Sequence, residues 1–509
     1  MKIIPPLLLC CVIYSCLNAQ PGALDKSFGV NGKVYTPYYN KQLNVIASAV
    51  QTDDKIVIAG TYYSSNKSGF FITRYLTKGD LDLNFGDSGK TVIDFGYNSY
   101  RAQAIAIQTD GKIIVTGYGS ANTTNNTFDM LTVRLTATGK PDSSFGNRGK
   151  LITDFGTNEF SNAVCVQTDG KIILGGVYNS VECLLVRYKS NGVLDTSFGD
   201  EGKVVSAISP ITGISSVIVQ PDKKIIAGGS DDYPKSVFLI SRYKPNGYID
   251  SSFGSNGFVH TQVSTHGDFS TKILLQSDGK IIAAGRTGTD NMSDTNKDMV
   301  AVRYKTGGTL DKTYGNGGIT TVSLNSSYLE ANSAAMQSDG KLILIGEGGP
   351  VSGPADFCVA RLTVDGKLDS LFGNKGIRFT NIKFHDIAYG GGIQNNNDII
   401  ATGISTTNNI NNSGISLAAY YGGDTTFASS SKSYIVNIYP NPASNQLHIE
   451  GLLSERTKIT VVDPAGCVKL HVVVNTASYS LNIASLKAGY YLLNFDMNGK
   501  VVTKQFVKL

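Results

Sequence analysis

The sequence predicts an all-β protein in which a seven-bladed β-propeller is followed by a small C-terminal antiparallel β-sandwich. The chain has 509 residues with 56 glycines, 14 prolines and no tryptophan, a composition typical of globular proteins built from many short strands and tight turns. Two motifs recur in phase along residues 24–421, and a small polar stretch then separates them from a second region of alternating apolar residues. These observations together predict the fold and its division into domains.

The first repeated motif has the pattern Leu-Asp-x-Ser-Phe-Gly and recurs at intervals of 53 to 61 residues. Its aromatic residues are Phe28, Phe85, Phe145, Phe198, Phe253, Tyr314 and Phe372. The second motif, Gln-x-Asp-Gly-Lys, keeps step with the first and begins at Gln108, Gln167, Gln220, Gln276 and Gln337, with a partial copy at Gln51 and a decayed copy at Gln394. Because a residue needed once for chemistry need not occur seven times, this repetition predicts a structural role.

Each repeated unit contains four candidate strands. In the first unit they span 33–38, 45–51, 55–62 and 70–76, and an Asp-Gly turn, as at Asp110-Gly111, is typical of the hairpin between the second and third strands. Units of about 57 residues with four antiparallel strands match propeller blades better than solenoid coils, which are shorter per turn. We therefore predict seven blades, with a β-solenoid or a different number of blades as the alternative.

A third repeated element is an arginine followed by tyrosine or leucine near the end of an apolar strand. A guanidinium that is buried there has to be paired and hydrogen-bonded. We expect its partner to be the aspartate of the Leu-Asp-x-Ser turn, such as Asp82 or Asp195, and we expect the aromatic residue of that turn to wedge between adjacent blades. The arginines are Arg74, Arg134, Arg187, Arg242, Arg303 and Arg361.

In these two motifs the body, residues 20–421, resembles the delta-60 repeat family of bacterial propeller-like proteins. The resemblance covers residues 24–421 and implies a propeller-like fold without any particular activity. The body has no net formal charge, because the N-terminal Lys2 contributes one of the five positive charges of the chain and the segment from Lys432 onward contributes four. A neutral body lacks the basic surface that nucleic-acid backbones require, so nucleic-acid binding is excluded.

The N-terminus is predicted to be a cleaved signal peptide, residues 1–19. It has a single basic residue, Lys2, then an apolar stretch over residues 3–17, and Ala19 before the expected cleavage site. The alternative is a lipoprotein signal, since the residues before Cys16 loosely resemble a lipoprotein cleavage box. No other apolar run reaches the length of a transmembrane helix, so no transmembrane segment is predicted.

The C-terminal region is predicted to be a separate domain, residues 434–509, after a flexible linker at 422–433. Its alternating apolar runs predict a small antiparallel sandwich. The order of its motifs is similar to the type A sorting domain of the type IX secretion system, which implies recognition by that machinery, delivery to the medium or the outer cell surface, and removal of the tag. The alternative is an ordinary terminal sandwich that binds a ligand. The motif residues are Tyr439, Pro440, Asn441, Pro442, Gly466, Gly489 and Tyr490.

Residues with catalytic potential are sparse in the body. We predict no catalytic, cofactor-binding or metal-binding residues, and His260, His266 and His385 lack zinc-type spacing. A calcium site formed by Asp290 and Asp294, with Asp298 just beyond their loop, is the alternative. Cys165, Cys183 and Cys358 replace apolar residues of other units and are predicted to be buried free thiols, while Cys467 lies in the C-terminal domain.

The function predicted from these patterns is that of an exported binding or structural propeller without enzymatic activity, in its concrete form an adhesin-like surface protein with a glycan or protein ligand. The alternative is a secreted polysaccharide-degrading enzyme, whose paired acids would have to face one cleft. A purely architectural surface scaffold is the third hypothesis. The candidate acids, found only by elimination, are Glu159, Glu182, Glu330 and Glu347.

Overall fold

The computed structural model of the chain divides into two compact units, Met1–Asp424 and Thr425–Leu509, which are described separately. The predicted leader 1–19, most of the predicted linker, Asp290, Asp294, Gly466 and Cys467 lie outside the described residues. The residues described are 20–39, 42–63, 68–121, 127–206, 211–231, 236–288, 297–325, 327–350, 353–407, 412–423, 436–451, 457–463, 468–497 and 500–509.

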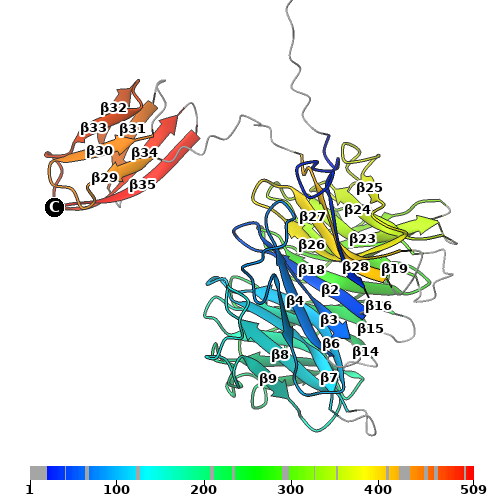
Figure 1. The fold of residues 1–509 in the computed structure, drawn as a ribbon. Coiled ribbons are helices and arrows are strands. Elements are labelled where there is room, and N and C mark those ends of the chain that lie inside the picture. Colours follow the sequence, from blue (N-terminus) through cyan, green and yellow to red (C-terminus); the bar gives the residue numbers. More distant parts are fainter. Residues whose placement is uncertain are drawn as a thin grey trace, which may run out of the picture. The chain divides into compact units, whose positions relative to one another are not determined.

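The described part of the first unit forms seven four-stranded antiparallel sheets, which we call blades A to G (Figure 1). This confirms the predicted all-β fold with seven propeller blades. From innermost to outermost strand, blade A is β2 (Gln42–Val50), β3 (Ile56–Tyr63), β4 (Ser68–Tyr75) and β5 (Lys90–Ile93); blade B is β6 (Ser99–Ile107), β7 (Ile113–Ser120), β8 (Asp129–Leu135) and β9 (Lys150–Thr153); blade C is β10 (Glu159–Val166), β11 (Ile172–Tyr178), β12 (Glu182–Tyr188) and β13 (Lys203–Ser206).

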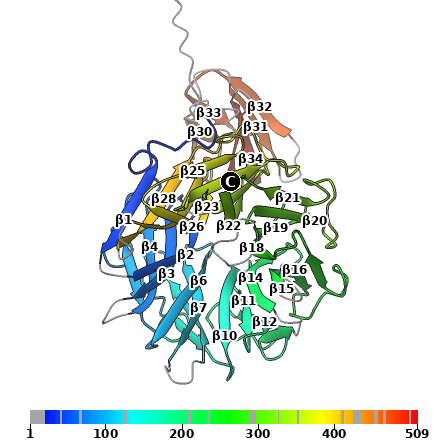
Figure 2. The same ribbon diagram turned by 90° about the vertical axis from the view of Figure 1, so that its right-hand side faces the viewer.

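The remaining blades repeat this order. Blade D is β14 (Ile211–Val219), β15 (Ile225–Asp231), β16 (Val237–Tyr243) and β17 (Phe258–Thr261); blade E is β18 (Asp268–Leu275), β19 (Ile281–Thr287), β20 (Met299–Tyr304) and β21 (Ile319–Val322); blade F is β22 (Ser327–Met336), β23 (Leu342–Pro350), β24 (Asp356–Leu362) and β25 (Ile377–Thr380); blade G is β26 (His385–Ile393), β27 (Ile399–Thr406), β28 (Asn412–Tyr420) and β1 (Lys33–Tyr39). Figure 2 shows innermost strands of several blades around the propeller centre.

The boundary between blades differs from the predicted unit by one strand. The sequence unit placed residues 33–38 first in the first blade, whereas β1 pairs with β28 as the outermost strand of blade G, with Lys33 opposite Ala418 and Tyr38 opposite Ser413. Each blade therefore combines the last three strands of one sequence unit with the first strand of the next. The reason is ring closure: pairing β1 with β28 covers a sheet edge that would otherwise be left open.

The apolar core of the propeller lies between neighbouring blades. Phe70 and Ile72 on β4 of blade A pack in one cluster with Tyr100, Ile113 and Val133 of blade B, and all five side chains are buried. Because both faces of each blade are covered in this way, the two middle strands are apolar over nearly their whole length rather than at alternate positions. Cys183 and Cys358 are buried and Cys165 is partly buried, and all three are free thiols as predicted.

The second unit consists of two small antiparallel sheets, which confirms the predicted sandwich. Alternate side chains of both sheets, such as Leu447, Ile459 and Phe495, form one buried core. The first sheet has the order β29 (Asn437–Tyr439), β30 (Gln446–Glu450), β33 (Ser478–Asn482), and the second has the order β32 (Val468–Val474), β31 (Thr457–Val462), β34 (Gly489–Met497), β35 (Lys500–Lys508). Within the described residues of the whole chain, no helix is long and apolar enough to cross a membrane.

Candidate functional site

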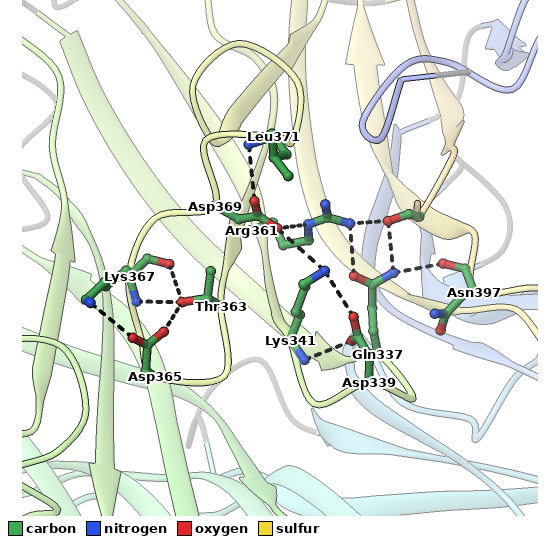
Figure 3. Close-up of polar contacts among 11 residues, drawn as sticks. Gln337, Asp339, Lys341, Arg361, Thr363, Asp365, Lys367, Asp369, Leu371 and Asn397 are labelled. Carbon is green, nitrogen blue, oxygen red and sulfur yellow. Dashed lines mark hydrogen bonds and ion pairs between the residues drawn. The ribbon is translucent and has the colours of Figure 1, made fainter. Parts of the chain in front are cut away.

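Each of the six repeated arginines forms an ion pair with the aspartate eight residues later, as predicted. The distance from Nε of the arginine to Oδ2 of the aspartate is 2.8 or 2.9 Å in every case, and both side chains are buried. Figure 3 shows this pair in blade F, where Asp369 receives hydrogen bonds from Arg361 and Leu371. The pairs are Arg74–Asp82, Arg134–Asp142, Arg187–Asp195, Arg242–Asp250, Arg303–Asp311 and Arg361–Asp369.

The same arginines connect one blade to the next. Arg242 of blade D donates from Nη1 to the backbone oxygen of Thr306 in a turn of blade E, at 2.7 Å, and its guanidinium carbon lies 4.6 Å from the centre of the Phe253 ring. Phe253 is buried against Gly308 of that turn, where an added Cβ would lie 3.0 Å from the ring. The aromatic residue thus packs between adjacent blades, and all seven aromatic residues of the motif are at most 1% exposed.

A lysine of the second motif completes the network in five blades. In blade C, Lys171 lies 3.3 Å from Asp195, which is already paired with Arg187. Burial acts to raise the pKa of Asp195, but hydrogen bonding by Ser197 and the charge of Arg187 outweigh it and lower the pKa to about 2. The carboxylate therefore stays ionised at neutral pH. The corresponding lysine–aspartate pairs are Lys112–Asp142, Lys171–Asp195, Lys224–Asp250, Lys280–Asp311 and Lys341–Asp369.

These contacts are architectural, so a ligand site has to be sought where the blades differ. The residue directly before each repeated glutamine is always apolar: Val50, Ile107, Val166, Val219, Leu275, Met336 and Ile393. The residue seven positions before the glutamine, near the start of the innermost strand, varies between the blades, with six residue types in seven blades. Its cross-strand neighbour on the second strand also varies between the blades.

We call these fourteen residues the variable mouth, because they lie beyond the residues that line the central cavity, at the end where the innermost strands begin. The second-strand residues Thr61, Val177 and Ser230 and the glycine at 213 are buried, whereas the remaining ten are at least partly accessible. The cross-strand pairs are Asn44–Thr61, Arg101–Tyr118, Phe160–Val177, Gly213–Ser230, Phe269–Arg286, Glu330–Glu347 and Ile387–Ile404.

The acidic pair of the mouth is embedded in a cluster of opposite charge. Glu330 lies 2.6 Å from Lys297 and 3.3 Å from Arg286, both of which come from blade E. Glu347 has no ion pair among the described residues. Burial, followed by the nearby charge of Glu330, raises the pKa of Glu347 to about 7. The two residues occupy directly opposite positions on neighbouring strands, but among the described residues it is Glu330 that has cations within ion-pair distance.

Aromatic side chains gather on the other side of the mouth, in blades B and C. Tyr118 and Phe160 meet edge to face with ring centres 4.7 Å apart, and Phe128 lies 5.3 Å from Phe160. All three are only half-buried. Partly exposed aromatic rings offer flat apolar surfaces on which sugar rings or apolar side chains can pack.

The other predicted candidates have structural surroundings. Glu159 is fully buried and accepts hydrogen bonds from the backbone nitrogens of Phe155 and Thr157, and it is separated from Glu182 by the intervening strand of blade C. Asp129, Asp154 and Glu159 bring carboxylate oxygens within 4.8 Å of one another, yet Glu159 is committed to these nitrogens. We therefore assign no metal to this group.

The histidines of the body do not converge on one site. His260 Nε2 lies 3.0 Å from Asp231 Oδ2, and His385 Nδ1 accepts a hydrogen bond from the backbone nitrogen of Ala355 at 3.0 Å. His266 is exposed. Arg286 and Lys297 were not singled out in the sequence. Aligning the repeats on their glutamines, and noting the positions at which the copies disagree, is the signal that would have found Arg286.

In the second unit, the motif residues connect the first sheet to the last strand. Asn441 donates from Nδ2 to the backbone oxygen of Gln505 and accepts from the nitrogen of Val507, both at 3.0 Å. The peptide bonds before Pro440 and Pro442 are cis. Tyr439 and Tyr490 keep 45% and 59% of their surface exposed, so both aromatic side chains face solvent within this unit.

Comparisons with known proteins agree with both parts of the fold. Residues 437–509 match the secretion system C-terminal sorting domain, and six segments match a domain of unknown function, the DUF5122 β-propeller. No curated protein matches the chain. The six segments are 51–85, 108–145, 167–198, 220–253, 276–314 and 337–372.

Solved structures similar to this chain have low sequence identity to it. A catalytically inactive virginiamycin B lyase from Staphylococcus aureus is 12% identical, with 76% of this chain and 98% of that chain covered and a TM-score of 0.41. Sqt1 from Chaetomium thermophilum is 11% identical, with 76% and 98% covered and a TM-score of 0.38. A quinonprotein alcohol dehydrogenase-like protein from Bacteroides thetaiotaomicron is 13% identical, with 67% and 69% covered and a TM-score of 0.37.

Proposed function

This chain is a propeller of DUF5122 repeats with a secretion system C-terminal sorting domain, and from that premise we propose that its propeller binds a ligand at the variable mouth without altering it chemically. The sorting domain marks the chain for type IX secretion to the cell surface or the medium. A ligand is therefore to be sought outside the cell. A glycan or a protein of another cell or of the surrounding matrix fits this location, which makes the protein adhesin-like.

The observation that carries this proposal is the divergence of the mouth within a single chain. Six of the seven blades share the buried Arg–Asp pair and all seven share the buried aromatic residue, yet the seven blades present seven different cross-strand pairs at one position. Side chains that every blade needs in order to fold are the same from blade to blade. The mouth side chains do not, and ten of them remain accessible. Accessible side chains that the fold does not prescribe are free to serve recognition.

The chemistry of the mouth favours a glycan. Tyr118 and Phe160 offer half-exposed rings for stacking, and the nearby Arg101 is exposed and able to donate several hydrogen bonds. Hydroxyl-rich ligands need such a combination of flat apolar surface and multiple polar groups. A protein ligand would use the same aromatic and arginine side chains, since these residue types dominate the binding energy of many protein interfaces.

A glycan-array screen of the purified full chain tests the proposal. It is run once with calcium and once with chelator, because a calcium requirement remains an open proposal for the loop between β19 and β20. Binding that is weakened at least tenfold in Phe160→Ala, and unchanged in the matched surface variant Leu83→Ala, supports the variable mouth, since Leu83 is 67% exposed on a repeated turn. Binding that survives Phe160→Ala places the ligand elsewhere, and a silent array points to a protein ligand or a scaffold.

A second candidate function is hydrolysis of a polysaccharide, favoured by the pairing of Glu330 with Glu347. Glycoside hydrolysis needs one ionised and one protonated carboxyl group facing the same bond. Burial raises the pKa of Glu347 to about 7, which suits this carboxyl group to carry a proton near neutral pH, while Lys297 and Arg286 lie beside Glu330 as counter-ions. Incubating any bound polysaccharide with the protein and with Glu347→Gln decides between the candidates: cleavage that the variant loses establishes the enzyme, and an intact polysaccharide establishes binding alone.

A further inference from the structure

One charged side chain distinguishes the lining of the cavity at the centre of the propeller. It is lined by residues of all seven innermost strands and has a volume of about 110 Å³. Four positions before the repeated glutamine, six blades carry alanine, serine or glycine, whereas blade E carries Lys272. Lys272 is the charged residue among the described lining residues, and its side chain is accessible to solvent.

Lys272 has no counter-ion in the described part of the chain. The nearest charged cluster of the mouth is internally paired, since Glu330 is shared by Lys297 and Arg286. The surrounding protein lowers the pKa of Lys272 by partial desolvation, and no neighbouring acid raises it. The side chain of Lys272 is accessible to solvent, so its ammonium group, with three N–H donors and no counter-ion among the described residues, is free to bind an anion that enters the cavity.

Two amide side chains of blades B and C line the same cavity. Gln103 and Asn162 have no hydrogen-bond partner among the described residues, although each carries two N–H donors. Both occupy the position where the register of the first two strands shifts, and such bulges redirect side chains. The neighbouring polar groups are already satisfied: Asn332 donates to the oxygen of Ala388 at 3.1 Å and Ser215 to that of Ser270 at 2.6 Å.

We infer that the central cavity is a binding site for a small anionic group, held by the ammonium group of Lys272 and the amide N–H groups of Gln103 and Asn162. Charge-assisted hydrogen bonds to an anion would compensate the lysine and use the free donors. A cavity of about 110 Å³ has room for a few water molecules or one such group. A free inorganic anion and the carboxylate of an acidic sugar share this chemistry.

An acidic sugar would reach the cavity from the variable mouth. On the innermost strand of blade E, Phe269 at the mouth is three residues from Lys272, a separation of roughly 10 Å along a strand. This part of the inference rests on the proposed function, because it places the carboxylate of a mouth-bound glycan in the cavity. The anion site itself does not depend on the mouth, so the two proposals can fail separately.

The test is a titration of the full chain followed by thermal unfolding and calorimetry. Phosphate, acetate and glucuronate are added at constant ionic strength in HEPES buffer, and neutral glucose serves as the ligand control. We expect saturable stabilisation by the anions, binding at least tenfold weaker in Lys272→Met, and partial retention in Lys272→Arg. The protein control is Lys26→Met, which removes an exposed lysine of a repeated turn. Gln103→Leu, with binding several-fold weaker, replaces Lys272→Met if that variant does not fold.

The outcomes separate the two ligand sources and the two proposals. Stabilisation by glucuronate alone identifies the acidic sugar, and equal stabilisation by phosphate and acetate identifies a free anion. No stabilisation by any anion, or unchanged binding in Lys272→Met, overturns the anion site even if the array detects neutral glycans at the mouth. If anions bind but the glycan array gives no signal, the anion site in the cavity is supported and the proposed glycan ligand is contradicted.

Discussion

Lys78 Nζ lies 3.1 Å from Asp25 Oδ2 across the junction at which the propeller ring closes. At the six other junctions the aspartate is paired with a buried arginine of its own blade, but here Ala419 occupies the arginine position, and the cation comes from the next blade. The Lys78 side chain is 54% exposed while Asp25 is 5% exposed. The closing junction therefore keeps the buried aspartate and exchanges its buried cation for a solvent-accessible one.

We expect Lys78→Met to destabilise the propeller only slightly, by less than about 1 kcal/mol, because water and salt screen a half-exposed ion pair. Equilibrium urea unfolding measures the change. Asp25 also accepts hydrogen bonds from Ser27, so Asp25→Asn should cost more than Lys78→Met. If Lys78→Met instead unfolds the protein, Lys78 has a role in closure that its exposure does not suggest.

Arg242→Ala should have a much larger effect, lowering the free energy of unfolding by roughly 3–5 kcal/mol. Its guanidinium is buried, and its removal leaves Asp250 charged and deprives Thr306 of a donor from the neighbouring blade. Differential scanning calorimetry of the variant measures the loss. Arg148→Ala, at an exposed arginine, is the matched control and should unfold like the unsubstituted protein. An unchanged melting temperature of Arg242→Ala would contradict the structural role of the repeated arginines.

The repeated aspartates should make the propeller sensitive to acid. The folded-state pKa values of Asp142, Asp195 and Asp311 are lowered to about 2 from an ordinary value of about 3.9. A lowered carboxyl pKa stabilises the fold at pH values above the ordinary value, and that stabilisation is lost as the pH falls through the folded value. Stability should therefore decrease between about pH 4 and pH 2. Asp195→Asn should flatten this part of the urea-unfolding profile, and a profile as steep as before would refute the assignment.

The sequence predicted the parts of the fold that every blade repeats. The Arg–Asp pairs and the aromatic wedges recur six or seven times, so periodicity identifies them without coordinates. The placement of β1 was predicted wrongly, because a strand at residues 33–38 has the same pattern whether it begins blade A or closes blade G. Its actual partner, β28, lies almost four hundred residues away in the sequence, and only ring closure selects it.

The site was harder to predict than the fold for a related reason. Glu330 and Glu347 were candidates by elimination, together with Glu159 and Glu182, because a sequence does not show which acids face one another. The cross-strand register of β22 and β23 brings the first two together, whereas Glu159 is buried against backbone nitrogens. Isolated, non-repeated contacts depend on register and loop geometry, which leave no periodic pattern.

Glu347 should make the propeller less stable in mildly alkaline solution. Its folded-state pKa of about 7 is above its ordinary value, so the folded protein retains a proton that the unfolded chain has lost. For a carboxyl group shifted upward, stability falls as the pH rises from the ordinary value to the folded value and then levels off. We expect Glu347→Gln to be more stable than the unsubstituted protein at pH 8 and similar to it at pH 4. Calorimetry at both pH values measures the difference, and equal melting temperatures at pH 8 would show that Glu347 is not strained when ionised.

The C-terminal unit should be required for export but not for folding of the propeller. It has its own buried core and forms a compact unit distinct from the blades, so deletion of residues 434–509 should leave the blade contacts intact. The truncated protein should accumulate in the periplasm, where fractionation and immunoblotting would detect it, while the full chain appears on the surface or in the medium. Asn441→Ala is the sharper variant, since it removes two hydrogen bonds that attach the motif to the last strand. Surface delivery of the truncated chain would show that the propeller itself carries an export signal.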